Sequence, residues 1–445
     1  MKAYRASLLW FAPHSEGPAH ALFEEDGMLV VGPNAAGFQV VQAIGSYRDL
    51  RVRYPAVAVE LFPGRTIAPG FVDLHLHYPQ TNVIGSPADG LLPWLENYTF
   101  PEEKRFAEPE YSAQAATFFI AELLRNGVTT ALAFATSHSE SINALFAQAQ
   151  AQRMRLITGL CLMDRNAPAD LLNQPSTPGR SDATEHSLRE TEALIQRWHG
   201  KDRLGYAITP RFAPTSTAAQ LRGAGDLAAQ YPDVWIQSHV AENKDEIAWA
   251  RQLFPQSRSY LSTYDDFGLM RKRAIYAHCI HFNDDDRALM RATGAAAAVS
   301  PTSNLFLGSG FFDYAGADRI GFDYGLASDV GGGTSFSPFH TMLGAYYVGR
   351  EGQTKQGLSL RPQQLWWQHT AGAARALGLD GSDGRPAVGN LLPGCEADFV
   401  VLNPSATPLL ARKTALATNL DEWLFSLIVL GDDRLIERTV ISQAI

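Results

Sequence analysis

From about Thr66 to Asp329 the chain alternates short apolar runs with longer amphipathic stretches, and this alternation constrains the fold more than any other feature. The apolar runs predict strands at residues 67–77, 129–136, 155–162, 204–212, 234–240, 274–280, 295–300 and 325–329. Helical periodicity fills most of the intervals, as at residues 111–125, 185–198, 217–230 and 244–253. Repeated β-then-α units with apolar strands predict an α/β fold, a parallel (β/α)8 barrel of the TIM type.

The two ends of the chain have a different pattern, made of short strands and turns. Residues 19–23 and 28–31 flank an acidic turn that ends at Gly27, which predicts a hairpin, and residues 398–402 form a strand after Pro393-Gly394. We expect residues 1–66 and 389–445 to form one small β-sandwich domain beside a barrel of residues 67–388. An open doubly wound sheet is the structural alternative, but no GxGxxG turn follows the first barrel strand.

Composition limits the partners and the compartment. The net charge is −9 and Lys and Arg form no run, so we expect a small substrate that is not a polyanion, and no nucleic acid. Cys161, Cys279 and Cys395 lie far apart without CxxC spacing, which favours a reducing compartment over a disulfide framework. The apolar stretch at residues 8–12 is too short for a secretory core, and no run of apolar residues could span a membrane, so we expect a cytoplasmic protein.

His75 and His77 end the first predicted barrel strand. Residues at i and i+2 of a strand point to the same face, and the carboxyl end of a barrel strand is where active sites form. Two imidazoles there can hold one metal ion. An isolated HxH also occurs on exposed edge strands, but the apolar approach to these residues and the abrupt Tyr78-Pro79 loop after them favour the metal site.

Further polar residues stand at the ends of three other predicted strands: His239, His278 and Asp329, with Glu242 three residues after the first. Each one alone is commonly a core histidine, a helix cap or a turn residue. Placed together at four strand ends of one barrel, they predict a metal centre. His138-Ser-Glu140 resembles the start of a cytidine-deaminase zinc motif, but the PCxxC that the motif also needs is absent from the sequence. We therefore expect His138 to be a loop residue.

The segment PGFVDLHLH ending at His77, the strand-end histidines and the Ser-Asp of the eighth strand resemble the amidohydrolase superfamily, in its single-metal aminohydrolase branch. The resemblance covers nearly the whole chain. It implies that His75, His77, His239 and Asp329 hold one metal, with a water completing the shell. Zinc suits this donor set, and Fe²⁺ or Mn²⁺ could occupy it. The two-metal branch needs a carboxylated lysine where this chain has Arg211, so one metal is expected.

Other segments resemble the guanine deaminases within that superfamily: residues 78–80, 94–101, 105–106, 209–212, 237–243 and 301–305. The block from Trp94 to Phe106 is the most discriminating of these, because generic barrel chemistry does not require it. The resemblance implies hydrolytic deamination of guanine to xanthine and ammonia in purine catabolism or salvage, and a homodimer. Two roles stay open for residues 94–106, a cover over the pocket and a hydrophobic plug or subunit interface.

The same resemblance implies a role for each site residue. Glu242 is expected to shuttle protons, His278 to orient the water, and Asp329 to act as both ligand and proton acceptor.

Three further residues are expected to bind the substrate. Arg211 would donate to the carbonyl oxygen of guanine, Gln80 would pair with the purine edge, and Phe212 would form an apolar wall. A salt bridge at the barrel rim is the alternative role for Arg211.

Two other functions stay open. The first is an aminohydrolase or chlorohydrolase acting on another purine, a pterin or a triazine, since such enzymes share the metal-site residues. The second is a barrel kept only as a scaffold. A scaffold would be expected to lack at least one site residue, whereas all are intact here.

Overall fold

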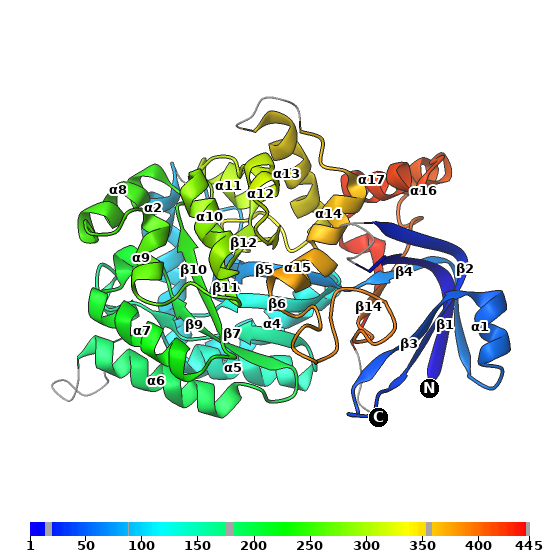
Figure 1. Ribbon diagram of the computed structural model, residues 1–445, viewed down its shortest axis with the longest axis horizontal. Helices are drawn as coiled ribbons and strands as arrows, with labels where there is room; N and C mark the ends of the chain where they lie inside the picture. Colours follow the sequence, from blue (N-terminus) through cyan, green and yellow to red (C-terminus); the bar gives the residue numbers. More distant parts are fainter. Residues whose placement is uncertain (14–19, 88, 174–181, 353–357, 442–445) are drawn as a thin grey trace.

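The computed structural model describes residues 1–13, 20–87, 89–173, 182–352 and 358–441, and it places a parallel barrel beside a smaller sheet (Figure 1). Neighbouring barrel strands follow one another in the order β5-β6-β7-β9-β10-β11-β12-β13. Their bounds are β5 (Phe71–His77), β6 (Val128–Phe134), β7 (Arg155–Thr158), β9 (Leu204–Pro210), β10 (Trp235–Val240), β11 (Ala274–His278), β12 (Ala296–Val299) and β13 (Tyr324–Leu326). A two-residue strand, β8 (Cys161–Leu162), pairs with β9. The predicted (β/α)8 barrel is confirmed.

Backbone hydrogen bonds join the first barrel strand to the segment that follows the last. The Asp329 N–H donates to the His75 carbonyl at 2.8 Å, and the His77 N–H donates to the Val330 carbonyl at 3.1 Å. The ring thus closes at the point where three of the predicted site residues stand.

The first predicted strand, residues 67–77, is two strands in the structure. β4 (Val59–Pro69) belongs to the small sheet, and β5 begins at Phe71. Gly70 lies between them, where a Cβ atom would come within 2.3 Å of the Thr129 side chain. The close approach of the chain to β6 therefore requires glycine at the junction between the two sheets.

The barrel strands are apolar because both of their faces are covered. Every residue of β5, β6, β9 and β11 is buried. The interior is filled by side chains that include Val72, Leu132 and Ile275, together with the alanines of α15 (Ala371–Ala376). The Trp235 indole N–H donates to the Leu377 carbonyl at 2.8 Å, which ties the segment after α15 to β10.

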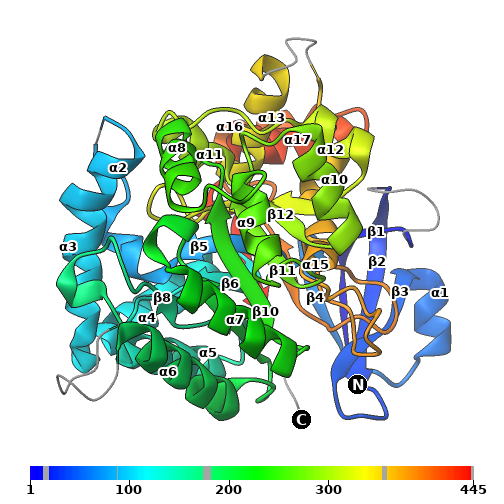
Figure 2. The ribbon, with the colours of Figure 1, turned by 60° about the vertical axis from the view of Figure 1, so that its left-hand side comes forward.

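Helices surround the barrel, and Figure 2 shows α5, α6 and α7 side by side on its outside. The helices of the barrel are α4 (Pro109–Arg125), α5 (Ser139–Ala151), α6 (Ala183–Trp198), α7 (Ala218–Gln230), α8 (Lys244–Leu253), α9 (Tyr260–Asp266), α10 (Asp284–Thr293), α11 (Pro301–Phe306), α12 (Tyr314–Ile320), α13 (Pro338–Glu351) and α14 (Pro362–Gln368). Side chains cap several of them: Asp182 accepts from the third residue of α6, and Thr217 does the same for α7.

The small sheet is built from both chain ends, as predicted, and has the strand order β15-β14-β4-β1-β2-β3. Its further elements are β1 (Lys2–Phe11), β2 (Ala21–Pro33), β3 (Gln39–Ser46), β14 (Phe399–Leu402), β15 (Ile436–Val440) and, beside β3, α1 (Tyr47–Arg53). Antiparallel pairing of Pro69 with Phe399 joins the N-terminal and C-terminal parts. The six strands form one hydrogen-bonded sheet in place of the two stacked sheets that a sandwich implies. The domain boundaries at 66/67 and 388/389 stay a prediction.

The predicted hairpin at Gly27 is wrong. β2 runs without a turn from Ala21 to Pro33, and it pairs with β1 along its length. The register shifts between the pairs Ala6–Gly27 and Leu8–Glu24, so a β-bulge absorbs one extra residue of β2. Asp26, which lies in this bulge, accepts two hydrogen bonds from Arg5 at 2.7 and 2.8 Å.

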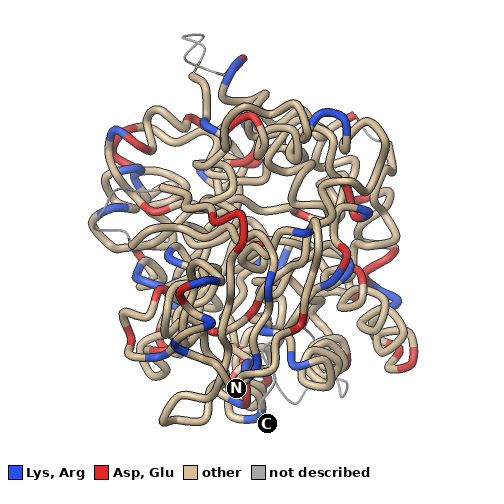
Figure 3. Tube along the Cα trace, turned by 90° about the vertical axis from the view of Figure 1, so that its right-hand side faces the viewer, with Lys and Arg blue, Asp and Glu red and all other residues tan. Residues whose placement is uncertain are grey.

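The C-terminal tail contains two helices that the sequence analysis did not predict, α16 (Pro408–Ala415) and α17 (Leu420–Leu430). α17 packs against α13 and α14, on the barrel side of the molecule (Figure 1). Acidic and basic residues are interspersed along the chain (Figure 3). Among the described residues, no helix combines the length and the apolar character that a membrane crossing requires.

Candidate active site

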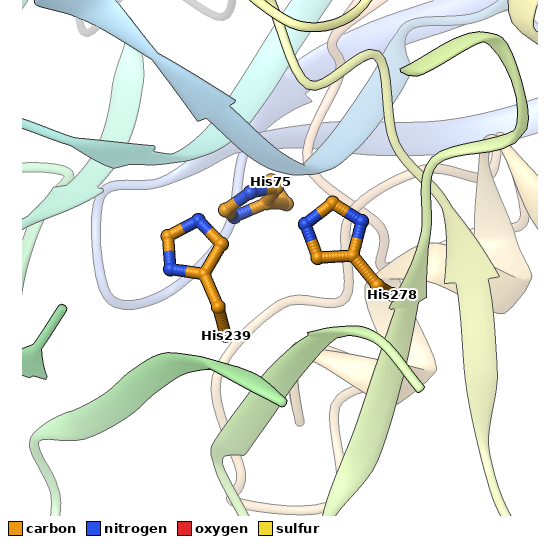
Figure 4. A group of neighbouring side chains, drawn as sticks. All are labelled: His75, His239 and His278. Carbon is orange, nitrogen blue, oxygen red and sulfur yellow. The ribbon is translucent and has the colours of Figure 1, made fainter. Parts of the chain in front are cut away.

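Three histidines from separate strands meet at the carboxyl end of the barrel. His75 lies on β5, His239 on β10 and His278 at the last residue of β11, and their rings are turned toward one another (Figure 4). The ring centroid of His75 is 4.8 Å from that of His239 and 5.6 Å from that of His278. The alternation of side chains along β5 brings His77 to the same place, with its Nε2 3.1 Å from the Nε2 of His239.

Asp329 completes the donor cluster. Its Oδ1 lies 3.1 Å from the Nε2 of His75 and 3.4 Å from the Nε2 of His77. Asp329 has a φ of 51° and His278 a φ of 72°, values that cost non-glycine residues about 1–3 kcal/mol. The structure holds both in this conformation at the barrel mouth, where their side chains face the same centre.

These side chains fit a divalent metal ion. The Nε2 of His75 is buried and has no hydrogen-bond partner among the described residues. Burial is the main cause that lowers the pKa of His75, His77 and His239 well below the ordinary value, so their imidazoles are neutral and carry a free lone pair. Two groups have donor atoms within 4.8 Å of one another: His75, His239 and His278, and His75, His77 and Asp329. Imidazole nitrogens and a carboxylate suit zinc.

Outer hydrogen bonds fix how two of the imidazoles are turned. The Nδ1 of His239 lies 2.6 Å from the Arg211 carbonyl, and the Nδ1 of His278 lies 2.9 Å from the Oδ1 of Asn304. Each Nδ1 therefore carries a proton that it donates outward, and each Nε2 faces the cluster.

Asp73 holds the backbone beside two residues of the donor cluster. Its Oδ1 accepts the N–H of His75 at 3.2 Å and the N–H of Ser328 at 3.0 Å, which links β5 to the segment carrying Asp329. The sequence analysis missed Asp73, although it stands two residues before His75.

Glu242 lies beside the donor cluster, with its Oε2 3.3 Å from the Nε2 of His278. Ser309 donates to its other oxygen at 2.9 Å. Burial, followed by the charge of Asp329, raises the pKa of Glu242 to about 8. A carboxyl group with such a pKa is protonated at neutral pH and can donate a proton to a bound ligand.

One pocket joins the donor cluster to the predicted substrate-binding residues. Its lining contains His77, His239, Glu242 and Asp329 together with Gln80, Arg211 and Phe212. Apolar side chains complete it: Leu91, Trp94, Leu95 and Leu307. Leu91 and Trp94 belong to α2 (Leu91–Trp94), which is followed by a π-helical turn (Leu95–Thr99) and α3 (Phe100–Glu103). Trp94 and Leu95, at the start of the 94–106 segment, therefore line the pocket.

Arg211 makes a buried ion pair, the alternative role expected for it, and its partner Glu103 is a residue that the sequence analysis did not identify. Its Nη1 donates to the Oε2 of Glu103 at 2.6 Å, and its Nη2 donates to the Oε1 at 3.0 Å. Burial by itself lowers the pKa of Arg211, but the charge of Glu103 raises it above the ordinary value. Arg211 thus lines the pocket and also forms a salt bridge. The position of Glu103 within the 94–106 segment was the only available signal, and it did not distinguish Glu103 from Glu102.

His138 is a loop residue, as predicted, and it belongs neither to the donor cluster nor to the described residues that line the pocket. Its Nδ1 lies 3.2 Å from the Thr136 hydroxyl and its Nε2 3.0 Å from the Asp170 carbonyl, which holds the loop before α5. His369 also has a structural contact away from the donor cluster. Its Nδ1 lies 3.0 Å from the Val72 carbonyl, which joins the end of α14 to β5.

Comparison with known proteins gives concordant results. Residues 66–442 match the model of the amidohydrolase family. The chain is 41% identical over 446 residues to the guanine deaminase of Escherichia coli (strain K12), covering 99% of this chain and 96% of that protein. A solved structure of E. coli guanine deaminase superposes with a TM-score of 0.91 at 40% identity, covering 99% and 98% of the two chains. The guanine deaminase of C. acetobutylicum, solved with guanine in its active site, gives a TM-score of 0.86 at 28% identity, covering 99% and 98%.

Proposed function

Because this chain belongs to the amidohydrolase family, we propose that it is a guanine deaminase, which hydrolyses guanine to xanthine and ammonia. The observation that carries the proposal is one pocket whose lining joins His77, His239 and Asp329 of the donor cluster to Glu242, Arg211 and Gln80. Nearly full-length similarity to guanine deaminases supports the same substrate.

We expect His75, His77, His239 and Asp329 to hold one divalent ion, for which zinc is the best match and Fe²⁺ or Mn²⁺ are alternatives. When bound, such an ion activates a water for nucleophilic attack at neutral pH. His278 is placed to orient that water through its Nε2, since Asn304 holds its Nδ1.

Glu242 carries the proton transfers. Its raised pKa keeps the carboxyl protonated, so it can donate to the ring nitrogen beside the carbon that is attacked. Asp329 accepts the proton released by the attacking water. Glu242, now ionised, takes the proton of the added hydroxyl and passes it to the amino group, so that the C–N bond breaks, the carbonyl of xanthine forms and ammonia leaves. The proton held by Asp329 then returns to Glu242. Water has then supplied the new oxygen of xanthine, and no oxidant or reductant is needed.

Arg211 and Gln80 account for the choice of ring. The guanidinium of Arg211 can donate to the carbonyl oxygen of guanine but meets an amino donor in adenine. Phe212 adds an apolar wall, and the residues of α2 exclude water from above.

The test is ammonia release by the zinc-loaded protein from guanine, adenine, cytosine, a pterin and a triazine, repeated with Glu242→Gln. We expect guanine-selective turnover that the substitution lowers by about 10²–10⁴-fold. Turnover of another ring in place of guanine would support the hydrolytic reaction at this site but contradict guanine as the substrate. A metal-loaded protein that turns over none of the five would support the scaffold alternative.

The cytoplasmic location and the homodimer are also proposals. Cys161, Cys279 and Cys395 are all free and buried, which suits a reducing compartment. Sedimentation of the purified protein would test the dimer.

A further inference from the structure

We propose that Glu103 is a positioning residue that makes the pocket selective for a ring carrying a carbonyl next to an N–H, which is the lactam edge of guanine. The inference rests on the proposed function and adds to it the residue that fixes the hydrogen-bonding pattern of the site. Glu103 is the last residue of α3, in the 94–106 segment whose residues Trp94 and Leu95 line the pocket.

Glu103 serves two pocket residues at once. Its Oε2 accepts from Arg211, and its Oε1 accepts from Arg211 at 3.0 Å and from the Nε2 of Gln80, also at 3.0 Å. The Glu103 side chain is fully buried, with an exposed fraction of 0%, and among the described residues it is not one of those that line the pocket. The carboxylate therefore acts through Arg211 and Gln80.

The contact with Glu103 decides which atom of Gln80 the ligand meets. A free amide can turn either its oxygen or its nitrogen toward a ligand. A carboxylate only accepts hydrogen bonds, so the amide nitrogen must face Glu103 and the oxygen must face away from it. The oxygen lies next to Gly331, where a Cβ atom would come within 2.1 Å of it.

The contact with Glu103 also fixes Arg211. Two of the five N–H groups of the guanidinium are used in the paired contact, which leaves other donors for a ligand. The ring of Phe100 lies 5.3 Å from the guanidinium carbon and packs against the same group. A paired carboxylate holds a guanidinium in one plane, whereas a single hydrogen bond allows rotation.

The resulting pattern is one donor, Arg211, beside one acceptor, Gln80. Guanine presents the complement, a carbonyl oxygen next to a ring N–H. Adenine presents the reverse at these positions, an amino donor next to a bare ring nitrogen. Without Glu103 the amide of Gln80 could turn over and accommodate either pattern, so the selectivity of Arg211 and Gln80 depends on a residue behind them.

The test compares guanine with 2-aminopurine, which keeps the amino group to be removed but lacks the carbonyl and the neighbouring N–H. We expect the wild-type protein to favour guanine in kcat/KM by about 10⁴-fold or more. Glu103→Gln is expected to lower this ratio by about 10- to 100-fold, through the rate with guanine. Glu102→Gln is the matched control, because Glu102 bonds to Asn82 at 2.8 Å and Arg105 at 3.0 Å instead, and its ratio should not change.

The exchange variant Gln80→Glu with Glu103→Gln keeps the buried charge and again leaves an acceptor oxygen facing the pocket. Arg211 keeps one of its two acceptors at position 103 in this variant. We therefore expect the variant to fold with a guanine to 2-aminopurine ratio between those of Glu103→Gln and the wild type, or, if Glu103→Gln alone does not fold, within about 100-fold of the wild-type ratio. The inference would be overturned if Glu103→Gln lowered kcat/KM by the same factor for guanine and for 2-aminopurine. It would also be overturned by an exchange variant that folds but whose ratio is no higher than that of Glu103→Gln. A wild-type protein inactive on guanine overturns the proposed function as well, and is recognised before any variant is made.

Discussion

Of the single side chains at the barrel mouth, we propose that His75 binds the metal and that Glu242 transfers protons. His75 offers a buried Nε2 with no hydrogen-bond partner among the described residues, whereas Glu242 is already held by the Ser309 hydroxyl. Removing one residue of each kind should therefore have different consequences.

We predict that His75→Ala loses both bound metal and activity, while Glu242→Gln keeps the metal and loses about 10²–10⁴-fold in rate. Elemental analysis of each purified variant, set against its rate of ammonia release, makes the distinction. Chelation should abolish the wild-type activity, and added zinc should restore it. A Glu242→Gln protein purified without metal under conditions that load the wild type would show that Glu242 belongs to the ligand set.

Gly331 is a second residue whose replacement has a defined effect. Its φ is 118°, and a Cβ there would meet the Gln80 oxygen at 2.1 Å. We predict that Gly331→Ala lowers kcat/KM for guanine at least about tenfold, because Gln80 must move from its place beside Glu103.

Gly37→Ala is the control for Gly331→Ala. Gly37 has a φ of 85° and nothing within 4 Å of an added Cβ. Both variants carry the backbone cost of about 1–3 kcal/mol that a side chain causes at positive φ, but only Gly331→Ala should lose activity. Equal activity of the two proteins would contradict the predicted position of the Gln80 amide.

Among the elements, α8 has a direct connection to the chemistry because it begins just after Glu242. Asn243 caps the helix by accepting the N–H of Asp245 at 2.8 Å, and Glu246 accepts the N–H of Glu242 at 3.1 Å and of Asn243 at 3.2 Å. The start of the helix thus fixes the backbone of Glu242, the proposed proton-transferring residue.

We predict that Asn243→Ala lowers the free energy of unfolding by about 1 kcal/mol and also lowers kcat, because a frayed helix start releases the backbone of Glu242. Asn283→Ala removes an equivalent cap from α10, where Asn283 accepts from Asp286 at 2.9 Å. Denaturant unfolding and steady-state rates should show similar stability losses in both variants and a lower kcat only in the first. A matching fall in kcat for Asn283→Ala would mean that general destabilisation explains the loss.

For the whole molecule, a buried cluster of charges joins the barrel to the C-terminal tail. Arg155 and Arg203, at the bottom of the barrel, both pair with Glu396, and Arg203 also pairs with Asp398. Breaking a buried pair leaves an uncompensated charge, which is among the more destabilising changes a protein can undergo.

We predict that Glu396→Gln lowers the free energy of unfolding by about 3 kcal/mol or more, with guanine turnover at 25 °C retained because the site lies at the other end of the barrel. The exposed pair between Arg189 and Glu185, 2.9 Å apart on α6, provides the comparison. Glu185→Gln should cost less than about 1 kcal/mol in the same denaturant titration. Similar losses in the two variants would show that the buried cluster contributes no more than a surface pair.

The contribution of Glu396 should also depend on pH. Burial by itself raises the pKa of Glu396, but Arg155 and Arg203 lower it below the ordinary value of 4.5. A carboxyl whose pKa is lower in the folded state stabilises the fold above pH 4.5, and this stabilisation disappears as the pH falls through the folded value. The stability difference between wild type and Glu396→Gln should be constant near neutrality and shrink below pH 4.5. A difference that stays constant down to pH 3 would contradict the ion pair as its source.

The sequence alone determined the barrel and the residues at its mouth. Apolar runs of strand length between amphipathic helices can be buried only in a covered parallel sheet, and the polar residues that end such runs must collect at one edge. His75, His77, His239, His278 and Asp329 were all predicted this way, and the structure brings them together. The substrate class came from resemblance at residues such as Arg211, since local pattern contains no information about the ligand.

Only the tertiary structure decided the contacts between distant segments. Glu103 and Arg211 are 108 residues apart, and no local periodicity distinguishes Glu103, which faces Arg211, from Glu102, which faces Asn82. The acidic segment ending at Gly27 has the composition of a turn, but pairing with β1 stabilises it as an extended strand with a bulge. The physical reason is the same in both cases. Local propensities are worth tenths of a kcal/mol per residue, and burial of a charge or completion of a strand ladder outweighs them.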